Sequence, residues 1–291
     1  MSAAEPEAVA GPSERLPVRR PALGGRLLGN EIRLLMRRRR NQLILVALAA
    51  IPVIIGVAVK ATTNSGSSAD GLIGSITNNG IFVSFTALVV VIPIFLPMAV
   101  SVVVGETIAG EAGAGTLRYL LAVPVGRTRL LVIKFLAVAF WCLLIATTVA
   151  VAGLVIGFAL FPAGDVTLLS GTQTTLLGGL GRLLLVVGYA GLMMLALAAA
   201  GLFISTLTEV PLAAMAASLG VAIAMQVLVA VPQLHALRPW LISNYFLDFG
   251  DVLRDPLLFG GLTHGALAAV AYIAIFFSLA WARFTSKDIT S

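Results

Sequence analysis

The sequence predicts an all-α polytopic membrane protein with six transmembrane helices and an N-terminal amphipathic elbow helix. Apolar residues make up 59% of the 291-residue chain and charged residues only 11%, against roughly 45–50% and about 25% in ordinary soluble domains. The mean hydropathy is +1.04, so a single water-soluble core cannot hide the apolar surface. Six apolar stretches are also long enough to cross a bilayer. These observations exclude a disordered, fibrous or disulfide-stapled protein.

The N-terminal region divides into a tail and a helix. Residues 1–21 are rich in Ala, Glu and Pro and lack hydrophobic periodicity, which is typical of a disordered tail. In residues 22–41 the apolar side chains, such as Leu28 and Ile32, recur at helical spacing with arginines between them. This pattern predicts a basic amphipathic helix that lies along the cytoplasmic face of the membrane.

Residues 42–283 form the predicted transmembrane domain, because a helix of about 20 apolar residues crosses roughly 30 Å of hydrocarbon. The third stretch is long, and we expect part of it to continue into the cytoplasm. Residues 284–291 then form a second cytoplasmic tail. The six predicted spans are residues 43–59, 81–104, 130–161, 183–207, 210–231 and 265–282.

The distribution of basic residues predicts the orientation. Of 19 Lys and Arg residues, nine precede residue 41, four lie between 118 and 134, and two follow residue 282. Placing these on the inside satisfies the positive-inside rule and puts both termini in the cytoplasm of a cell (inner or plasma) membrane. Residues 37–40 are four consecutive arginines before the first span, without interleaved aromatic residues. They favour contacts with membrane lipids over nucleic acid.

Charged residues are absent from the middle of the predicted spans. Ion-coupled transporters usually hold ionisable groups near the midplane, and intramembrane proteases need a catalytic cluster. The chain also lacks a Gly-x-x-x-x-Gly-Lys-Ser/Thr phosphate loop. We therefore expect no catalytic residue, cofactor or metal in this chain, and an energy source on another one. A self-contained channel, or a carrier that binds ions through backbone carbonyls, remains the alternative.

The predicted cytoplasmic loop between spans two and three covers residues 105–129. Its carboxylates are Glu106 and Glu111. Thr116 can cap a short helix that Pro124 ends. Taken alone, this pattern is typical of an interfacial helix with a positively charged flank.

The loop also carries a sequence pattern, Glu111-x-Gly-x-Gly-Thr-Leu-x-x-Leu-Leu-x-x-Pro-x-x-Arg127, followed by Lys134. This pattern resembles the coupling loop of ABC-2 type transporter permeases, although Gly126 stands where that family usually has Ser. The predicted elbow helix and six spans resemble the same family. The resemblance implies a dimer with a second permease copy or homologue, and two ABC ATPase subunits that hold ATP and Mg²⁺. The residues it assigns to the ATPase contact are Glu31, Arg33, Glu106, Glu111, Thr116, Leu117, Arg118, Leu121, Pro124 and Arg127.

Residues 232–264 form the predicted outer segment. It holds too many apolar side chains for a solvated loop, so we expect short re-entrant helices with Trp and Tyr at headgroup level. Three aspartates, Asp248, Asp251 and Asp255, favour a solvated acidic face over a metal site. By the family resemblance, the outer gate candidates are Trp240, Tyr245 and Phe246.

The second span contains Pro93 and Pro97, which free backbone carbonyls and predict a kink. The resemblance implies that spans two and five of two permeases enclose the substrate path. An apolar path suits outward movement of a hydrophobic or amphiphilic cargo, such as a drug, lipid or peptide. The candidate lining residues are Phe82, Phe85, Phe95, Met98, Met215, Met225 and Gln226.

Overall fold

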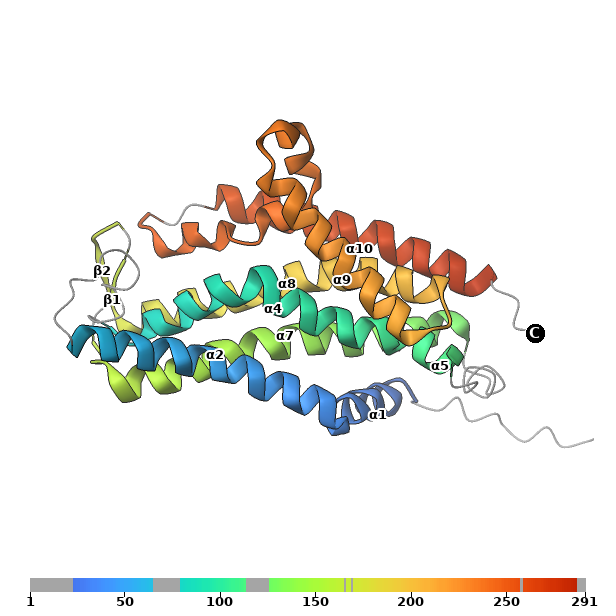
Figure 1. The fold of residues 1–291 in the computed structure, drawn as a ribbon, viewed down its shortest axis with the longest axis horizontal. Helices are drawn as coiled ribbons and strands as arrows, with labels where there is room; N and C mark the ends of the chain where they lie inside the picture. Colours follow the sequence, from blue (N-terminus) through green and yellow to red (C-terminus); the bar gives the residue numbers. More distant parts are fainter. Residues whose placement is uncertain are drawn as a thin grey trace, which may run out of the picture.

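The computed structural model describes residues 23–64, 79–113, 126–164, 166–168, 170–256 and 259–286 (Figure 1). It confirms the all-α class, and six of its helices are long and apolar enough to cross a membrane. The α-helices are α1 (Leu23–Arg37), α2 (Arg39–Asn64), α4 (Ile81–Thr107), α5 (Ala109–Gly113), α7 (Arg127–Leu160), α8 (Leu176–Leu207), α9 (Pro211–Ala230) and α10 (Gly260–Ser286).

The remaining elements are short and follow α7 and α9. A two-stranded antiparallel hairpin pairs β1 (Val166–Thr167) with β2 (Gln173–Thr174). Gly171 lies in its turn with φ +82°, a left-handed conformation that glycine adopts at low cost. Three 3-10 helices, η1 (Pro232–Trp240), η2 (Ile242–Tyr245) and η3 (Asp248–Leu253), occupy the predicted outer segment.

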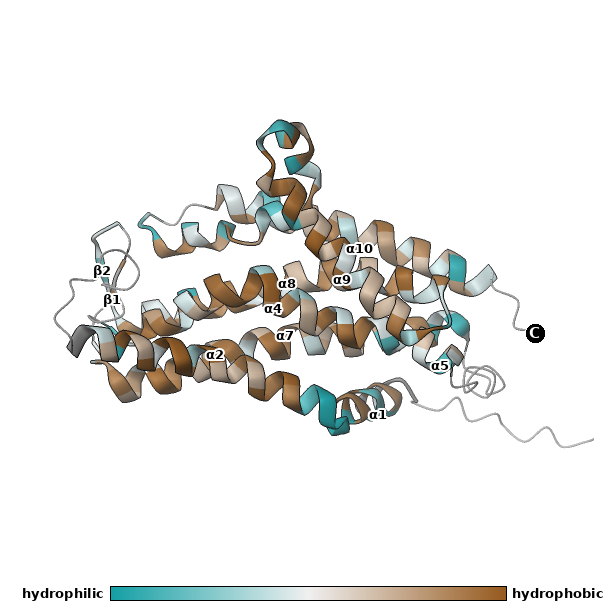
Figure 2. Cartoon of the chain, viewed as in Figure 1, coloured by the Kyte–Doolittle hydropathy of each residue, from teal (hydrophilic) through white to brown (hydrophobic). Residues whose placement is uncertain are grey.

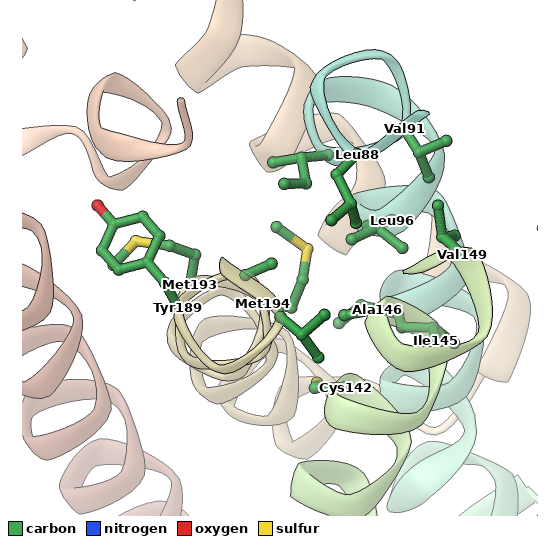
Figure 3. Packing of buried hydrophobic residues seen from close by; sticks show 14 of the residues in the cluster. Leu88, Val91, Leu96, Cys142, Ile145, Ala146, Val149, Tyr189, Met193 and Met194 are labelled. Carbon is green, nitrogen blue, oxygen red and sulfur yellow. The ribbon is translucent and has the colours of Figure 1, made fainter. Parts of the chain in front are cut away.

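Helices α4, α7 and α8 pack against one another and form the centre of the bundle. Their facing side chains include Leu96 of α4, Ile145 of α7 and Met194 of α8, all fully buried (Figure 3). Helix α2 covers α7, α9 covers α4, and α10 covers α8. Four of the six long helices, α2, α7, α9 and α10, therefore keep much of their apolar surface on the outside of the chain, as Figure 2 shows.

Glycines bring α4 and α7 close together. A Cβ atom on Gly80 would overlap the backbone of Gly157, and a Cβ atom on Gly153 would come within 2.6 Å of the Cα atom of Ser84. The Ser84 hydroxyl then donates a hydrogen bond of 2.9 Å to the Ala150 carbonyl. In a membrane no hydrophobic effect drives helices together, so they associate through close packing. Small residues allow the backbones of α4 and α7 to approach closely enough for such packing.

Helices α2, α4, α7 and α8 run between two distinct ends of the molecule (Figure 1). We call one the basic end; it comprises α1, α5, the arginines 37–40 and the start of α7 (Figure 1). The other is the hairpin end, which carries β1 and β2. Helix α10 finishes at the basic end, so the last described residues lie at the same end of the molecule as α1.

The predicted elbow helix ends earlier than expected. Helix α1 stops at Arg37 and α2 begins at Arg39, so the break falls within the arginine run. The side chains of Asn41 and Gln42 donate hydrogen bonds of 2.9 and 3.0 Å to the carbonyls of Leu35 and Met36. The last carbonyls of a helix lack hydrogen-bond partners within it. The two amides supply partners for the carbonyls at the end of α1, and so hold α1 and α2 in a defined relative orientation.

The membrane helices are generally longer than the hydropathy pattern alone defines. Helices α2, α8 and α10 include polar flanks that a search for apolar residues omits, and α7 begins at Arg127 rather than at residue 130. The predicted loop 105–129 likewise contains the last turn of α4 and all of α5. The tail predicted for residues 284–291 begins later than expected, because residues 284–286 belong to α10. Residues 1–21 and 287–291 lie outside the described residues.

Candidate functional site: a charge cluster at the basic end

A cleft of about 420 Å³ opens at the basic end, between α1, α4, α5, α7 and the start of α9. Its walls carry Glu31 of α1, Glu106 of α4, Glu111 of α5 and Lys134 of α7. The three glutamates predicted for the ATPase contact therefore share one cleft, although they come from three different helices.

We call Glu31, Glu106, Glu111 and Lys134 the charge cluster, and Lys134 lies at its centre. The residue is only 4% exposed, and its ammonium group pairs with the Glu111 carboxylate and lies 3.7 Å from a Glu31 carboxylate oxygen. Because a buried charge is costly without partners, these two carboxylates make the position of Lys134 possible. Lys134 thereby ties α7 to both α1 and α5.

A second ion cluster joins the elbow to the end of α4. Arg38, between α1 and α2, and Arg40, at the start of α2, both pair with the Glu106 carboxylate. The second Arg40 nitrogen donates to the other Glu106 oxygen at 2.7 Å, so Arg40 binds it in the two-point geometry typical of guanidinium–carboxylate pairs. These ion pairs link the end of α4 to the elbow.

Ser205 of α8 holds the junction between α4 and α5. Its fully buried hydroxyl accepts hydrogen bonds from the backbone N–H groups of Ile108 and Ala109, at 3.2 and 3.0 Å. It also donates one of 3.1 Å to the Gly105 carbonyl. One side chain thus satisfies the backbone groups that a helix break leaves without intrahelical partners.

The first turn of α7 is tied to the last turns of α10. The Arg127 guanidinium donates to the Thr285 carbonyl at 2.9 Å, and the Trp281 indole N–H donates to the Thr128 hydroxyl at 2.9 Å. Arg127 therefore faces α10 and stands apart from the cleft that holds the three glutamates.

Arg33 of α1 is exposed, and the cleft-lining residues do not include it. The rest of the predicted contact, comprising Thr116, Leu117, Arg118, Leu121 and Pro124, lies outside the described residues.

The arrangement joins an elbow helix, an ion-paired junction and six long apolar helices. Residues 26–239, about three quarters of the chain, match the family model described as ABC-2 family transporter protein. The chain belongs to this family. The match runs from α1 to the end of η1, and so includes the whole charge cluster. A search of curated proteins finds no matching relative.

The ABC-2 permease candidates for a substrate path on α4 fall into two groups. Phe82 and Phe85 are each 1% exposed, with ring centroids 6.0 Å apart, and pack inside this single chain. Phe95 is half-buried, and Met98 is exposed on the same face as Val90 and Ile94. In this conformation, only the second half of α4 presents candidate side chains to the outside.

The candidates on α9 are all half-buried: Met215, Met225 and Gln226. Gln226 donates its amide N–H to the carbonyl of Pro93 on α4. That carbonyl lies four residues before Pro97, which has no N–H to offer it. Gln226 therefore fills a hydrogen bond that the α4 backbone lacks, and it ties α9 to α4.

The outer segment is held by side chains that donate to its backbone. Tyr189 of α8 bonds to the carbonyl of Tyr245 at 2.7 Å, and Arg182 of α8 bonds to the carbonyl of Val252 at 2.6 Å. Among the gate candidates of this permease, Phe246 is buried, Tyr245 is half-buried, and Trp240 is 77% exposed. The three candidates therefore occupy different environments.

The aspartates of the outer segment do not assemble a metal site. Within the described part of the chain, no three His, Cys, Asp or Glu residues are close enough to hold one ion. Burial raises the pKa of Asp248 above its ordinary value; the nearby Asp251 carboxylate raises it further, while His264 lowers it.

Sequence reasoning did not assign a site role to Lys134, Arg38, Arg40 or Ser205. The signal for Lys134 was present, since the family pattern places a lysine seven residues after Arg127. No spacing along the chain indicated that Ser205 would reach α5, because that contact joins residues 96 positions apart.

Proposed function

We propose that this ABC-2 permease is the transmembrane half of an ATP-driven exporter. Two separate ATPase subunits supply the energy, a second permease copy or homologue completes the pathway, and both termini lie in the cytoplasm. The cargo is hydrophobic or amphiphilic and moves outward. The single observation that carries the proposal is the set of ion pairs at the basic end. These pairs join α7 to α1 and α5, and α4 to the start of α2.

The membrane interior supports an external energy source. In the six long helices of the described chain, Asp, Glu, Lys, Arg and His stand within about two turns of a helix end. The deepest of them at the basic end, Lys134, is paired with Glu31 and Glu111. Coupling ions usually bind at ionisable groups near the midplane, so energy must enter from outside the spans.

The basic end supports a mechanical route for that energy. Residues 114–125, which the family resemblance assigns to the ATPase contact, connect α5 directly to α7. Helix α5 is bonded to Lys134 of α7 and to Ser205 of α8. A displacement of the loop that moves α5 is therefore passed on to α7 through these contacts. Through Glu106 and its arginines the same displacement reaches α2. Rigid helices joined in this way transmit rigid-body motion.

The experiment is co-expression with the ATPase encoded nearest to this chain, followed by purification through a tag on the permease. We expect the ATPase to copurify, and Glu111→Gln and Arg127→Gln to reduce its recovery. Asp255→Asn and Arg254→Gln are the matched controls, because they remove the same charges from exposed sites in the outer segment. The controls should recover the ATPase like the wild type.

Reconstituted vesicles test the transport step. We expect a fluorescent amphiphile to be moved only when the permease, the ATPase and Mg-ATP are all present. Accumulation of the probe by the permease alone, driven by an ion gradient, would overturn the proposal and favour a self-contained carrier.

A further inference from the structure

A second hollow at the basic end lies on the other side of α7 from the charge cluster's carboxylates. It is an apolar groove of about 650 Å³ between α1 and the start of α7. Gly25 and Leu28 form the α1 wall, and Val132, Ile133 and Leu136 form much of the α7 wall. Of the groove-lining residues in the described chain, only Arg129 is charged.

The groove continues into a stripe that faces away from the bundle. Val132, Leu136, Phe140 and Leu143 follow one another at intervals of three or four residues along α7, and each is 37–48% exposed. Residues at that spacing share one helix face. Arg129 precedes Val132 by three residues, so it stands on this face at the end nearest the groove.

The groove therefore has one cationic side chain, Arg129, at the end of a stripe of exposed apolar side chains on α7. Arg26 on α1, next to Gly25, and the arginines 37–40 add positive charge at the same end. An elongated ligand with an anionic head and an apolar tail complements this surface. An anionic phospholipid has that form, and basic side chains at a membrane surface attract such lipids.

We propose that the groove between α1 and α7 binds one anionic phospholipid of the leaflet at the basic end. The headgroup phosphate lies against Arg129, and an acyl chain follows Leu28, Val132 and Leu136 into the apolar stripe. The bound lipid fills the gap beside the elbow helix and so holds α1 against α7. This inference does not depend on the proposed ATPase partner.

The test uses the purified full-length chain in detergent, stripped of lipid. Equal amounts of dioleoyl phosphatidylglycerol and dioleoyl phosphatidylcholine are added, and native mass spectrometry counts the lipids retained. The two lipids have the same acyl chains, so a preference reports the headgroup. We expect the wild type to retain one phosphatidylglycerol in preference to phosphatidylcholine, and Arg129→Gln to reduce this preference about fivefold.

Filling the groove should abolish binding. A Cβ atom at Gly25 meets nothing within 4 Å, so Gly25→Phe can occupy the groove without straining the helix. Gly29→Phe is the matched control: it lies one turn later on α1, is equally open, and does not line the groove. Gly126, the residue before α7, also lines the groove, is equally open and has φ −55°. Gly126→Leu therefore fills the groove from that side should Gly25→Phe fail to fold.

Arg283→Gln controls for the loss of an exposed positive charge at the same end. Loss of the preference in Arg283→Gln as well as in Arg129→Gln would indicate a diffuse surface effect and overturn the proposal. Equal retention of the two lipids by the wild type, or unchanged retention in both groove-filling variants, would overturn it too. If filling the groove blocks ATPase recovery but leaves the lipid bound, the groove is a protein contact instead.

Discussion

Ion pairs between helices distinguish the basic end from the rest of the described bundle. At the basic end, charged side chains from separate helices meet one another, as Lys134 meets Glu111 and Arg40 meets Glu106. In the spans and the outer segment, a single polar side chain reaches a backbone carbonyl, as Gln226 reaches Pro93 and Tyr189 reaches Tyr245.

This difference separates a region suited to rearrangement from one suited to fixed packing. The exposed pairs of Arg38 and Arg40 with Glu106 are weakened by salt and can be exchanged for pairs with a partner. A hydrogen bond to a carbonyl in an apolar setting has no competing water, so breaking it leaves a costly unsatisfied group. The variants below test whether the two regions respond as differently as their contacts imply.

Removing the lysine of the charge cluster should have the largest effect. Lys134→Met leaves Glu31 and Glu111 without their shared cation, and breaking a buried ion pair costs about 3–5 kcal/mol. Because both carboxylates are partly exposed, we expect the lower part of that range. The measurement is chemical unfolding in detergent, at low and high salt.

Lys60→Met is the control for losing a lysine from a membrane helix. The Lys60 ammonium lies over the Phe161 ring, 5.5 Å from its centroid, and such contacts are worth about 0.5–1 kcal/mol at exposed sites. A Lys134→Met variant no less stable than Lys60→Met would refute the role of Lys134 as the centre of the cluster. The wild type should lose stability in salt, and Lys134→Met should lose less.

The contact between α9 and α4 should give the next largest effect. Gln226→Leu leaves the Pro93 carbonyl without a donor, and a fully buried unsatisfied group costs about 1–3 kcal/mol. Because this contact is only partly buried, we expect the lower part of that range. Pro97→Ala restores a backbone N–H four residues after Pro93. The double variant Gln226→Leu, Pro97→Ala should therefore be more stable than Gln226→Leu alone. Additive effects of the two substitutions in a double-mutant cycle would contradict this explanation.

The same contacts show what the sequence could and could not predict. Six spans followed from length and hydropathy, because each apolar stretch is at least about 17 residues long, which is enough to cross the hydrocarbon core independently of its neighbours. The presence of Pro97 predicted a freed carbonyl, but not that Gln226, 133 residues away from Pro93, would satisfy it. Likewise, the sequence identified the loop glutamates as candidate site residues. It could not predict that Lys134 pairs with Glu31 and Glu111, because that contact depends on which helices pack together.

The outer segment should respond less strongly to loss of a single donor. Tyr189→Phe removes the hydrogen bond to the Tyr245 carbonyl, at a cost of about 1 kcal/mol. A Cβ atom on Gly265 of α10 would overlap the Tyr189 hydroxyl. Gly265→Ala should therefore be destabilising in the wild type and less so in Tyr189→Phe. Thermal unfolding of the four proteins measures this coupling, and equal effects of Gly265→Ala in both backgrounds would refute it.

The smallest expected effect is the pH dependence contributed by Asp248. Its pKa is raised in the folded chain by burial and by Asp251, so between the ordinary and the raised pKa the folded state binds more protons than the unfolded state. Stability then falls as pH rises through this window, and the loss persists above it. Asp248→Asn removes this loss of stability. The variant should therefore exceed the wild type in stability most at neutral pH, and the difference should shrink as pH falls. Melting temperatures from pH 7 to pH 4 measure the difference, with Asp255→Asn as the control for removing a neighbouring carboxylate. The Asp248 side chain also lies beside Gly261 at the start of α10. A constant difference in melting temperature between wild type and Asp248→Asn would show that this packing, rather than proton binding, sets the contribution of Asp248.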